Sequence, residues 1–227
     1  RPPISTLFPY TTLFRSRHLL VNHPVNIERK AQSKLEANYL LLRGGGLYKT
    51  FPNFEATWGL KAACVAGAGL YKGVAAMLGM TVVPVAGATG VVDTDIRAKF
   101  ARALELLREG FDFVFVHVKA ADSLGEDGKF TEKRDFISRI GAAAEVFLDM
   151  PDDVLLVLTA DHTTPCVLKT HSGDPVPLLF SGYGVIPDRV DRFGERACRE
   201  GGMGRIKGLE LIPEIINVLG RSELYGA

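Results

Sequence analysis

The sequence predicts an α/β fold: a mostly parallel sheet with helices on both faces. Short apolar runs of strand length alternate along most of the chain with longer segments of helical periodicity. The strand-like runs are continuously apolar, which is typical of parallel strands buried on both faces. The strands that this pattern predicts are residues 60–66, 81–85, 111–118, 154–159 and 176–181.

Helices are expected between these strands. The predicted helices are residues 67–78, 93–108, 130–150 and 209–219. The second carries one apolar stripe, as a helix that covers a sheet requires; the stripe is Ile96, Phe100, Ala103, Leu104 and Leu107. In the first, the apolar positions are Leu70, Val74, Met77 and Leu78. An earlier apolar run, residues 38–42, ends at Arg43 and three glycines and predicts a buried strand that leads into a flexible loop.

The amino terminus does not fit this pattern. Residues 1–16 (RPPISTLFPYTTLFRS) show neither helical nor strand periodicity and lack the features of a signal peptide. The string resembles translated sequencing-adapter sequence, so we interpret it as non-native; the alternative is a disordered tail. Residues 17–37 are polar and are interpreted as a helix end followed by a linker.

Composition excludes several classes of function. The 227 residues carry a net charge of +1, so nothing in the charge predicts a nucleic-acid or membrane partner. No apolar run reaches the ~18 residues of a membrane helix. The cysteines, three in number, are far apart and form no CxxC pair, which indicates a reduced, cytoplasmic protein. The oligomeric state is not predicted.

Metal-ligand residue types follow two of the predicted strands. Asp122 comes after the strand at 111–118, Asp161 and His162 follow the strand at 154–159, and His171 lies nine residues further on. Ligands of parallel sheets bind beyond the carboxyl ends of the strands, so we expect these side chains to meet there. Carboxylate and imidazole groups suit Mn²⁺, Mg²⁺ or Zn²⁺. Two such ions can stabilise the entering and leaving oxygens of phosphoryl transfer.

Each of these residues also has a purely structural interpretation. Asp161 could cap the turn that follows it through Thr163 and Thr164, and a lone histidine is often only a hydrogen-bonded surface group. The convergence of three loops at the carboxyl ends of the strands favours a metal site over these structural interpretations.

The motifs in these loops resemble those of a known family. Residues 159–166 (TADHTTPC) and 171–177 (HSGDPVP) resemble the metal-binding signature of the archaeal-type cofactor-independent phosphoglycerate mutases, which are alkaline phosphatase-like metalloenzymes. The similarity runs from about residue 17 to the carboxyl end. It includes LLRGGG at 41–46, GLKAAC at 59–64, GATG at 87–90, DTD at 93–95 and GGMGRI at 201–206.

The resemblance implies an incomplete alkaline phosphatase-like fold. Residues 17–37 would be the end of an inserted domain and its return linker, and residues 38–227 the carboxyl-terminal portion of the metalloenzyme domain. It implies two divalent ions, with Mn²⁺ favoured and Mg²⁺, Co²⁺ or Zn²⁺ as alternatives, and no 2,3-bisphosphoglycerate cofactor.

The resemblance also implies roles for individual residues. Asp122 and His171 would bind one metal, and Asp161 and His162 the other. Arg43 and Lys61 would face the phosphate or carboxylate of a phosphoglycerate substrate, since cations recognise such anions. The alternative for these two is a solvated loop arginine and a strand-edge lysine.

Two positions depart from the family pattern. Glu126 stands where the family has a histidine; we predict that it ligates through oxygen, which favours manganese or magnesium over zinc. Ligation by Asp127 or a weakened metal site are the alternatives. The nucleophilic serine and an early metal-binding aspartate of the family have no counterpart here, because Ser5, Ser16 and Ser33 lie in the wrong context.

The prediction is therefore a fragment of a phosphoglycerate mutase that interconverts 3-phosphoglycerate and 2-phosphoglycerate through phosphoserine. Without the serine, the covalent route has no first step, so the chain alone is expected to be inactive. Alternatives are a related phosphatase, a homoserine kinase-like phosphotransferase, or a metal-depleted remnant without catalytic function.

Overall fold

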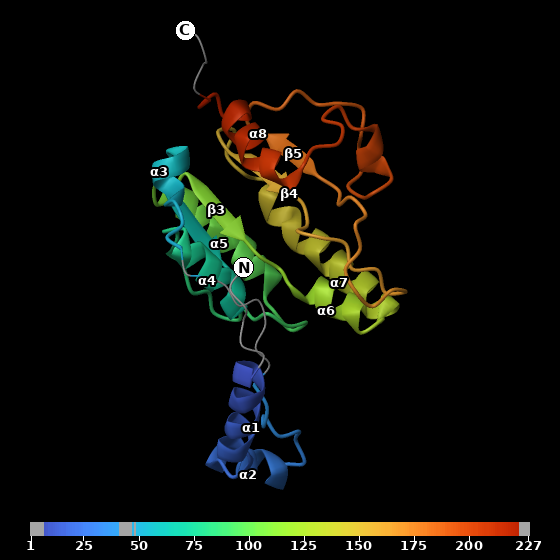
Figure 1. The fold of residues 1–227 in the computed structure, drawn as a ribbon. Coiled ribbons are helices and arrows are strands. Elements are labelled where there is room, and N and C mark those ends of the chain that lie inside the picture. The colour runs from blue at the N-terminus through green and yellow to red at the C-terminus, as the bar shows by residue number, and fades with distance from the viewer. Residues whose placement is uncertain (1–6, 41–46, 48, 223–227) are drawn as a thin grey trace. The chain divides into compact units, whose positions relative to one another are not determined.

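The computed structural model describes residues 7–40, 47 and 49–222. The chain divides into two units, residues 1–50 and residues 51–227 (Figure 1).

The smaller unit contains two helices, α1 (Leu7–Val21) and α2 (Pro24–Ala31). His23 caps α2 through its ring Nδ1, which accepts a hydrogen bond from the backbone of Val25 at 3.3 Å. Asn26 is buried, and its side chain exchanges hydrogen bonds with the backbone of Ala37 and also donates to Leu20. This one asparagine therefore ties both helices to the segment that leaves them.

Two expectations for this unit differ from the structure. No regular element was expected before residue 17, yet α1 begins at Leu7. The buried strand expected at 38–42 is wrong for residues 38–40, which form no regular element and leave Tyr39 and Leu40 about half exposed. The described part of this unit contains no strand with which they could pair. Residues 41 and 42 lie outside the described residues.

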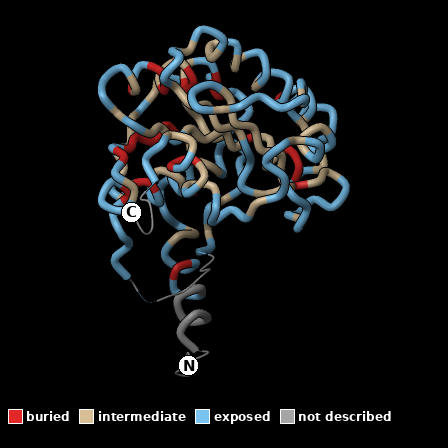
Figure 2. The backbone as a smooth tube through the Cα atoms, turned by 90° about the horizontal axis from the view of Figure 1, so that it is seen from above, coloured by how far each residue is buried: buried red, intermediate tan, exposed pale blue. Residues whose placement is uncertain are grey.

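The larger unit is built on a three-stranded parallel sheet with the order β2-β1-β3. The strands are β1 (Ala62–Val65), β2 (Thr81–Val82) and β3 (Phe113–Val116), so three of the predicted strands are confirmed with shorter bounds. Every residue of the central strand β1 is buried. Figure 2 shows how the buried positions are distributed along the backbone.

Helices surround this sheet. They are α3 (Phe54–Trp58), α4 (Gly69–Met77), α5 (Ile96–Arg108), α6 (Ala120–Glu126), α7 (Phe130–Ala143), which continues as the 3₁₀ turn η1 (Ala144–Phe147), and α8 (Leu211–Val218). Two further 3₁₀ turns are η2 (Ala197–Glu200) and η3 (Gly208–Glu210). Asp95 caps α5 by accepting a hydrogen bond from Ala98, and the predicted stripe of α5 is buried except for Leu107, which is half-buried.

Helix α4 presents its apolar side chains differently from the usual pattern. Leu70, Val74 and Met77 are 71%, 49% and 51% exposed, whereas the small Ala75 is buried against Cys64 and Ala66. Small side chains on both elements let α4 lie close to β1, and the larger apolar residues consequently face outward.

A second, two-stranded sheet follows in the chain. It pairs β4 (Leu155–Leu158) with β5 (Leu179–Gly182). Both strands were predicted, but β5 lies antiparallel to β4 rather than in one parallel sheet with it. The physical reason is the connection: parallel neighbours need a crossover, usually helical, and no helix lies between Leu158 and Leu179.

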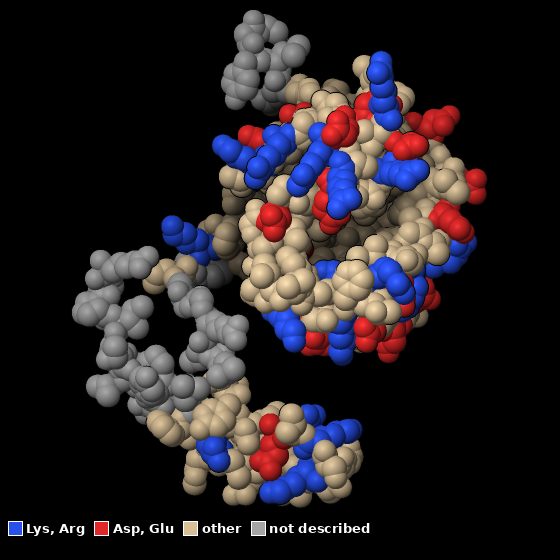
Figure 3. All heavy atoms as spheres, turned by 90° about the vertical axis from the view of Figure 1, so that its right-hand side faces the viewer, with Lys and Arg blue, Asp and Glu red and all other residues tan. Residues whose placement is uncertain are grey.

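On the face shown in Figure 3, basic and acidic side chains are interspersed rather than gathered by sign. In the part of the chain that is described, no helix combines the length and the hydropathy that crossing a bilayer would demand.

Candidate metal centre

Asp122 lies in the first turn of α6, just beyond the carboxyl end of β3. Its side chain is 17% exposed. Lys119 donates to Oδ2 at 2.7 Å, and the Thr164 hydroxyl donates to Oδ1 at 2.7 Å. Burial opposes ionisation of Asp122, but these hydrogen bonds and nearby positive charge outweigh it and lower the pKa. Asp122 is therefore a carboxylate at neutral pH, which is the form that binds a cation.

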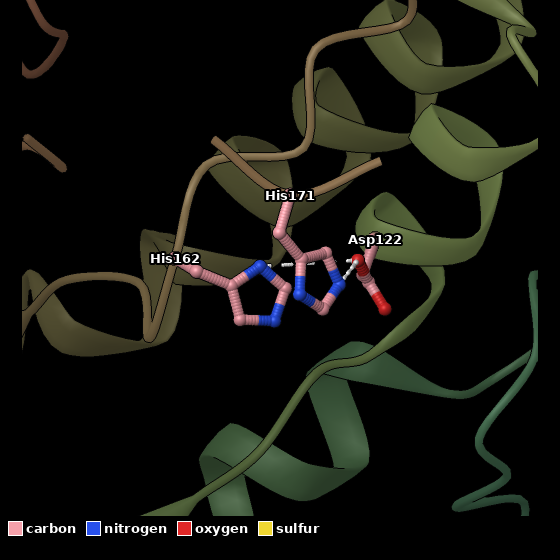
Figure 4. A group of neighbouring side chains, drawn as sticks. All are labelled: Asp122, His162 and His171. Atoms are coloured by element: carbon pink, nitrogen blue, oxygen red, sulfur yellow. Dashed lines mark ion pairs between the residues drawn. The ribbon is translucent and has the colours of Figure 1, made fainter. Parts of the chain in front are cut away.

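His162 and His171 lie on the segment between β4 and β5. The backbone of Ser172 donates to Thr163 at 2.9 Å, and this bridge brings the two histidines together. Their rings stack with centroids 3.7 Å apart. His171 Nε2 lies 3.4 Å and His162 Nδ1 4.0 Å from the same oxygen, Oδ1 of Asp122 (Figure 4).

These three residues form a group with the chemistry of a metal site. One ligand atom from each lies within 4.8 Å of those of the other two. Ligands bound to one ion at about 2.0–2.2 Å are separated by up to roughly 4 Å, so small side-chain movements would complete the coordination. One carboxylate and two imidazoles are a donor set that Zn²⁺ or Mn²⁺ accepts.

Asp161 and Glu126 lie at the rim of this cluster. Asp161 Oδ2 is 3.4 Å from His162 Nε2, and Glu126 Oε1 is 3.8 Å from His171 Nε2. Both side chains are about half exposed. Asp127, the alternative to Glu126, instead pairs with Lys129 at 3.1 Å. The structure therefore groups three of the five predicted metal ligands, and each of the other two lies beside one of the histidines. That these five residues bind metal, and how they divide between two ions, stays a prediction.

The two predicted substrate residues are not part of this group. Lys61 immediately precedes β1, and its ammonium lies 4.6 Å from the centre of the Phe111 ring. Strands β1 and β3 are parallel. Lys61 therefore lies at the amino-terminal end of the strands, whereas Asp122 follows β3 at their carboxyl-terminal end. Arg43 lies outside the described residues.

Glycine permits the close approach of α6 to the histidine segment. A Cβ on Gly125 would lie 2.4 Å from the carbonyl oxygen of Thr164. The same oxygen accepts a hydrogen bond from Lys133 of α7 at 2.7 Å. Gly125 and Lys133 thus hold Thr164 where its hydroxyl can reach Asp122.

Sequence reasoning missed four residues of this site: Tyr71, His117, Lys119 and Thr164. His117 follows β3 and stacks on Tyr71 at 3.3 Å, and burial lowers its pKa to about 4, so its ring is neutral at pH 7. The i,i+3 spacing of Lys119 and Asp122 on a helix start is a signal that could have revealed their pairing. The stack of Tyr71 on His117 joins distant segments and has no such local signal.

Fold and cluster together define a metal-binding α/β protein, with its ligands beyond the carboxyl ends of strands. A profile of the metalloenzyme superfamily matches residues 15–216. The chain belongs to this superfamily.

Particular relatives agree with the resemblance found in the sequence. The chain is 43% identical over 216 residues to a 2,3-bisphosphoglycerate-independent phosphoglycerate mutase of Thermococcus kodakarensis, a match that covers 94% of this chain and 52% of the relative. The corresponding protein of Pyrococcus furiosus is 42% identical over the same shares. The chain thus spans about half the length of the curated relatives it matches.

Solved structures support the fold. A protein from Pyrococcus horikoshii superposes with a TM-score of 0.87 at 41% identity, covering 100% of this chain and 60% of the other. A cofactor-independent phosphoglycerate mutase from Thermoplasma acidophilum gives a TM-score of 0.63 at 30% identity, covering 92% of this chain and 50% of the other. The predicted fold class and the resemblance to the archaeal mutases are confirmed.

Proposed function

We propose that this chain is part of a metal-dependent phosphoglycerate mutase that interconverts 3-phosphoglycerate and 2-phosphoglycerate, a glycolytic step, through a phosphoserine. The observation that carries the proposal is the cluster of Asp122, His162 and His171, in a chain 43% identical to a relative with this name. The cluster supports metal binding, and the relatives supply the reaction.

The proposed metal ligands are Asp122, Glu126 and His171 for one ion, and Asp161 and His162 for the other. Bound divalent ions would neutralise the negative phosphoryl oxygens. Three carboxylates among five ligands favour a hard ion, so Mn²⁺ is the proposed metal. In the absence of metal, Lys119 stabilises the ionised form of Asp122, because its ammonium lies 2.7 Å from that carboxylate.

The proposed substrate is a phosphoglycerate, and no 2,3-bisphosphoglycerate cofactor is proposed. Arg43 stays a candidate for binding its anionic groups. Lys61 would need a large displacement to bind these groups, since it lies at the amino-terminal end of the strands and the metal cluster lies at their carboxyl-terminal end. A cytoplasmic location is supported by three cysteines that are all free thiols, Cys64, Cys166 and Cys198.

A chimera tests the reaction. The matched 216 residues of the Thermococcus kodakarensis relative are replaced by the corresponding residues of this protein. With Mn²⁺, the chimera is expected to interconvert the two phosphoglycerates, and Asp122→Asn should abolish the activity while Asp127→Asn retains most of it. Hydrolysis of simple phosphate esters without interconversion would instead favour the phosphatase alternative.

The 227-residue chain itself provides the second test. It should bind Mn²⁺ yet show no mutase activity, because no serine that fits the nucleophile is found in it. Robust interconversion by the purified chain would contradict this expectation, and absence of any divalent-ion binding would favour the metal-depleted remnant.

A further inference from the structure

The segment after the central strand β1 brings a tyrosine to the end of the sheet where the metal centre lies. Strand β1 ends at Val65, and α4 begins at Gly69, so Tyr71 in the first turn of α4 lies beyond the carboxyl end of β1. Asp122 lies beyond the carboxyl end of β3, which is parallel to β1. In parallel sheets, this is the end at which ligands bind.

The ring of Tyr71 is held in place by His117. The two rings stack with centroids 3.3 Å apart and an interplanar angle of 22°. The backbone of His117 is fixed on two sides, because its amide donates to Val65 at 2.9 Å and its carbonyl oxygen accepts a hydrogen bond from the buried Lys99 at 3.3 Å. Burial lowers the pKa of His117 to about 4, so a neutral ring supports Tyr71 at pH 7.

The hydroxyl of Tyr71 lies in the electrostatic field of the metal centre. Burial raises the pKa of this hydroxyl, and the negative charges of Asp161 and Asp122 raise it further, while the Lys119 ammonium opposes them. Exposed charges are largely screened beyond about 10 Å, so the hydroxyl lies near these residues. The raised pKa keeps the phenol protonated at neutral pH, which makes it a hydrogen-bond donor.

This donor is available to a bound molecule. Within the part of the chain that the structure describes, the Tyr71 hydroxyl takes part in no hydrogen bond, although tyrosine hydroxyls that are removed from solvent usually find a partner. Lys119, a second donor beside the centre, is already engaged with Asp122 at 2.7 Å. Tyr71 therefore combines a fixed ring with an unused donor at the rim of the metal centre.

We infer that Tyr71 is a substrate-binding residue, whose hydroxyl donates a hydrogen bond to a phosphoryl oxygen of the phosphate monoester that the metal centre binds, and that His117 is the residue that positions its ring. A phosphoryl group offers three acceptor oxygens, so metal ions and a hydroxyl can bind it together. This role of Tyr71 rests on the proposed function, because the anion is expected only where metal is bound.

The charge of the centre explains why the donor is neutral and why binding should depend on metal. Without an ion, the carboxylates of Asp122, Asp161 and Glu126 repel a phosphate anion, and the Lys119 ammonium offsets only one of these charges. Divalent ions reverse the sign of the site. A tyrosine hydroxyl then adds a hydrogen bond to the anion without adding a positive charge that would compete with the ions.

The alternative is that Tyr71 only covers the ring of His117. Phenylalanine would then serve equally well, because the stacking contact does not use the hydroxyl. Tyr71→Phe therefore separates the two interpretations, since it keeps the ring and removes only the donor.

The test is a titration of inorganic phosphate into the Mn²⁺-loaded 227-residue chain, followed by the phosphorus NMR relaxation that bound Mn²⁺ causes. Tyr71→Phe is expected to weaken phosphate binding by about 10-fold or more, because a hydrogen bond to a charged group is lost, and to leave Mn²⁺ affinity unchanged. Tyr183→Phe is the matched control: Tyr183 pairs with Val154 at the end of β4 opposite to His162, so phosphate affinity should not change. Without metal, phosphate should not bind to the parent chain.

Two variants of His117 test its positioning role. His117→Ala removes the support of the Tyr71 ring, so phosphate affinity should fall while Mn²⁺ affinity stays unchanged. His117→Phe restores an aromatic surface and should recover most of the phosphate affinity. Equal phosphate affinity in the parent chain and in both variants would exclude a positioning role for His117.

The chimera with the Thermococcus kodakarensis relative supplies a second readout. There, Tyr71→Phe should raise KM for 3-phosphoglycerate by about 10-fold and change kcat much less. Weaker phosphate binding by Tyr71→Phe, together with a parent chimera that lacks mutase activity, would support the role of Tyr71 and count against the proposed reaction.

Three results would overturn the role of Tyr71. The first is equal phosphate affinity of Tyr71→Phe and the parent chain when both are loaded with Mn²⁺. The second is a parallel loss of Mn²⁺ affinity in Tyr71→Phe, which would mean that the residue acts through the metal. The third is a parent chain that binds Mn²⁺ but no phosphate.

Discussion

At the scale of single residues, Asp122 contributes both to the packing of the site and to its capacity to bind a cation. Its two oxygens accept from Lys119 and Thr164, and one of them also faces both histidines. Lys119 immediately precedes α6, and the other three partners lie on the segment between β4 and β5, so one carboxylate connects α6 with the histidine segment. Removal of Asp122 would therefore disturb both metal binding and local packing, which makes the rim residues better probes of coordination.

Glu126 tests whether the departure from the family pattern preserves a ligand. Glu126→Gln keeps the size and removes the charge, so Mn²⁺ affinity in calorimetric titration should fall about 10-fold, or about 1.4 kcal/mol. Asp127→Asn is the matched control, because that carboxylate pairs with Lys129. Glu126→His should shift preference toward zinc; unchanged affinity and preference in both Glu126 variants would rule out ligation by Glu126.

His117 predicts a pH dependence of stability. Burial lowers its pKa to about 4 from an ordinary value of 6.5, so between these pH values the unfolded chain binds a proton that the folded chain does not. Stability attributed to His117 is thus complete above pH 6.5 and is lost as the pH falls toward 4, by about 1–3 kcal/mol in total.

The measurement is urea denaturation at pH 7 and pH 5. His117→Phe keeps an aromatic ring beside Tyr71 without a titrating group, so the variant should lose less stability than the parent chain between these pH values. Asp122 does not confuse the comparison, because its lowered pKa places its own transition below this window. Equal losses in the two proteins would contradict the role of His117.

At the scale of elements, the features that were predicted correctly are those that the side chains of a single segment determine. The apolar stripe of α5 and the apolar run of β1 are set by side chains within each segment, and both were placed correctly. The antiparallel pairing of β5 depends on its connection to β4, and the outward-facing residues of α4 depend on how closely small residues pack. Neither property can be read from a window of one element.

Close packing between α4 and its neighbours can be tested at a glycine just before the helix. A Cβ on Gly67 would lie 1.9 Å from the carbonyl oxygen of Thr89, the same oxygen that accepts a hydrogen bond from the buried Lys99 at 3.0 Å. Gly67→Ala should displace this backbone from the Lys99 ammonium and cost about 2–4 kcal/mol in the free energy of unfolding.

Gly73 offers the matched control within α4. A Cβ there meets nothing within 4 Å, so Gly73→Ala should leave stability unchanged or raise it by up to about 1 kcal/mol, through higher helix propensity. Equal unfolding midpoints for the two alanine variants in urea would show that the approach of Thr89 to Gly67 does not constrain the fold.

At the scale of the whole molecule, the grouping of the metal ligands was predictable because the loops that follow parallel strands all lie at the carboxyl ends of those strands. That rule placed Asp122 near His162 and His171 although they are far apart in sequence. It did not reveal Lys119 or the stack of Tyr71 on His117, which depend on side-chain packing. It does not bear on Lys61, which was assigned from the family resemblance and lies just before β1; its role in substrate binding stays a prediction.

The position of the cluster predicts that metal stabilises the larger unit as a whole. Asp122 belongs to the helix after one sheet, and His162 and His171 belong to the segment that leaves the other. The ion proposed at Asp122 and His171 would cross-link the two sheets, and a ligand that binds only the folded state stabilises it by about 2.7 kcal/mol at 100 times its Kd. Thermal unfolding with and without Mn²⁺ measures the effect. His171→Ala should remove most of the metal-dependent rise in Tm while Asp127→Asn retains it; a rise that survives His171→Ala would mean that the ion binds elsewhere and does not join the two sheets.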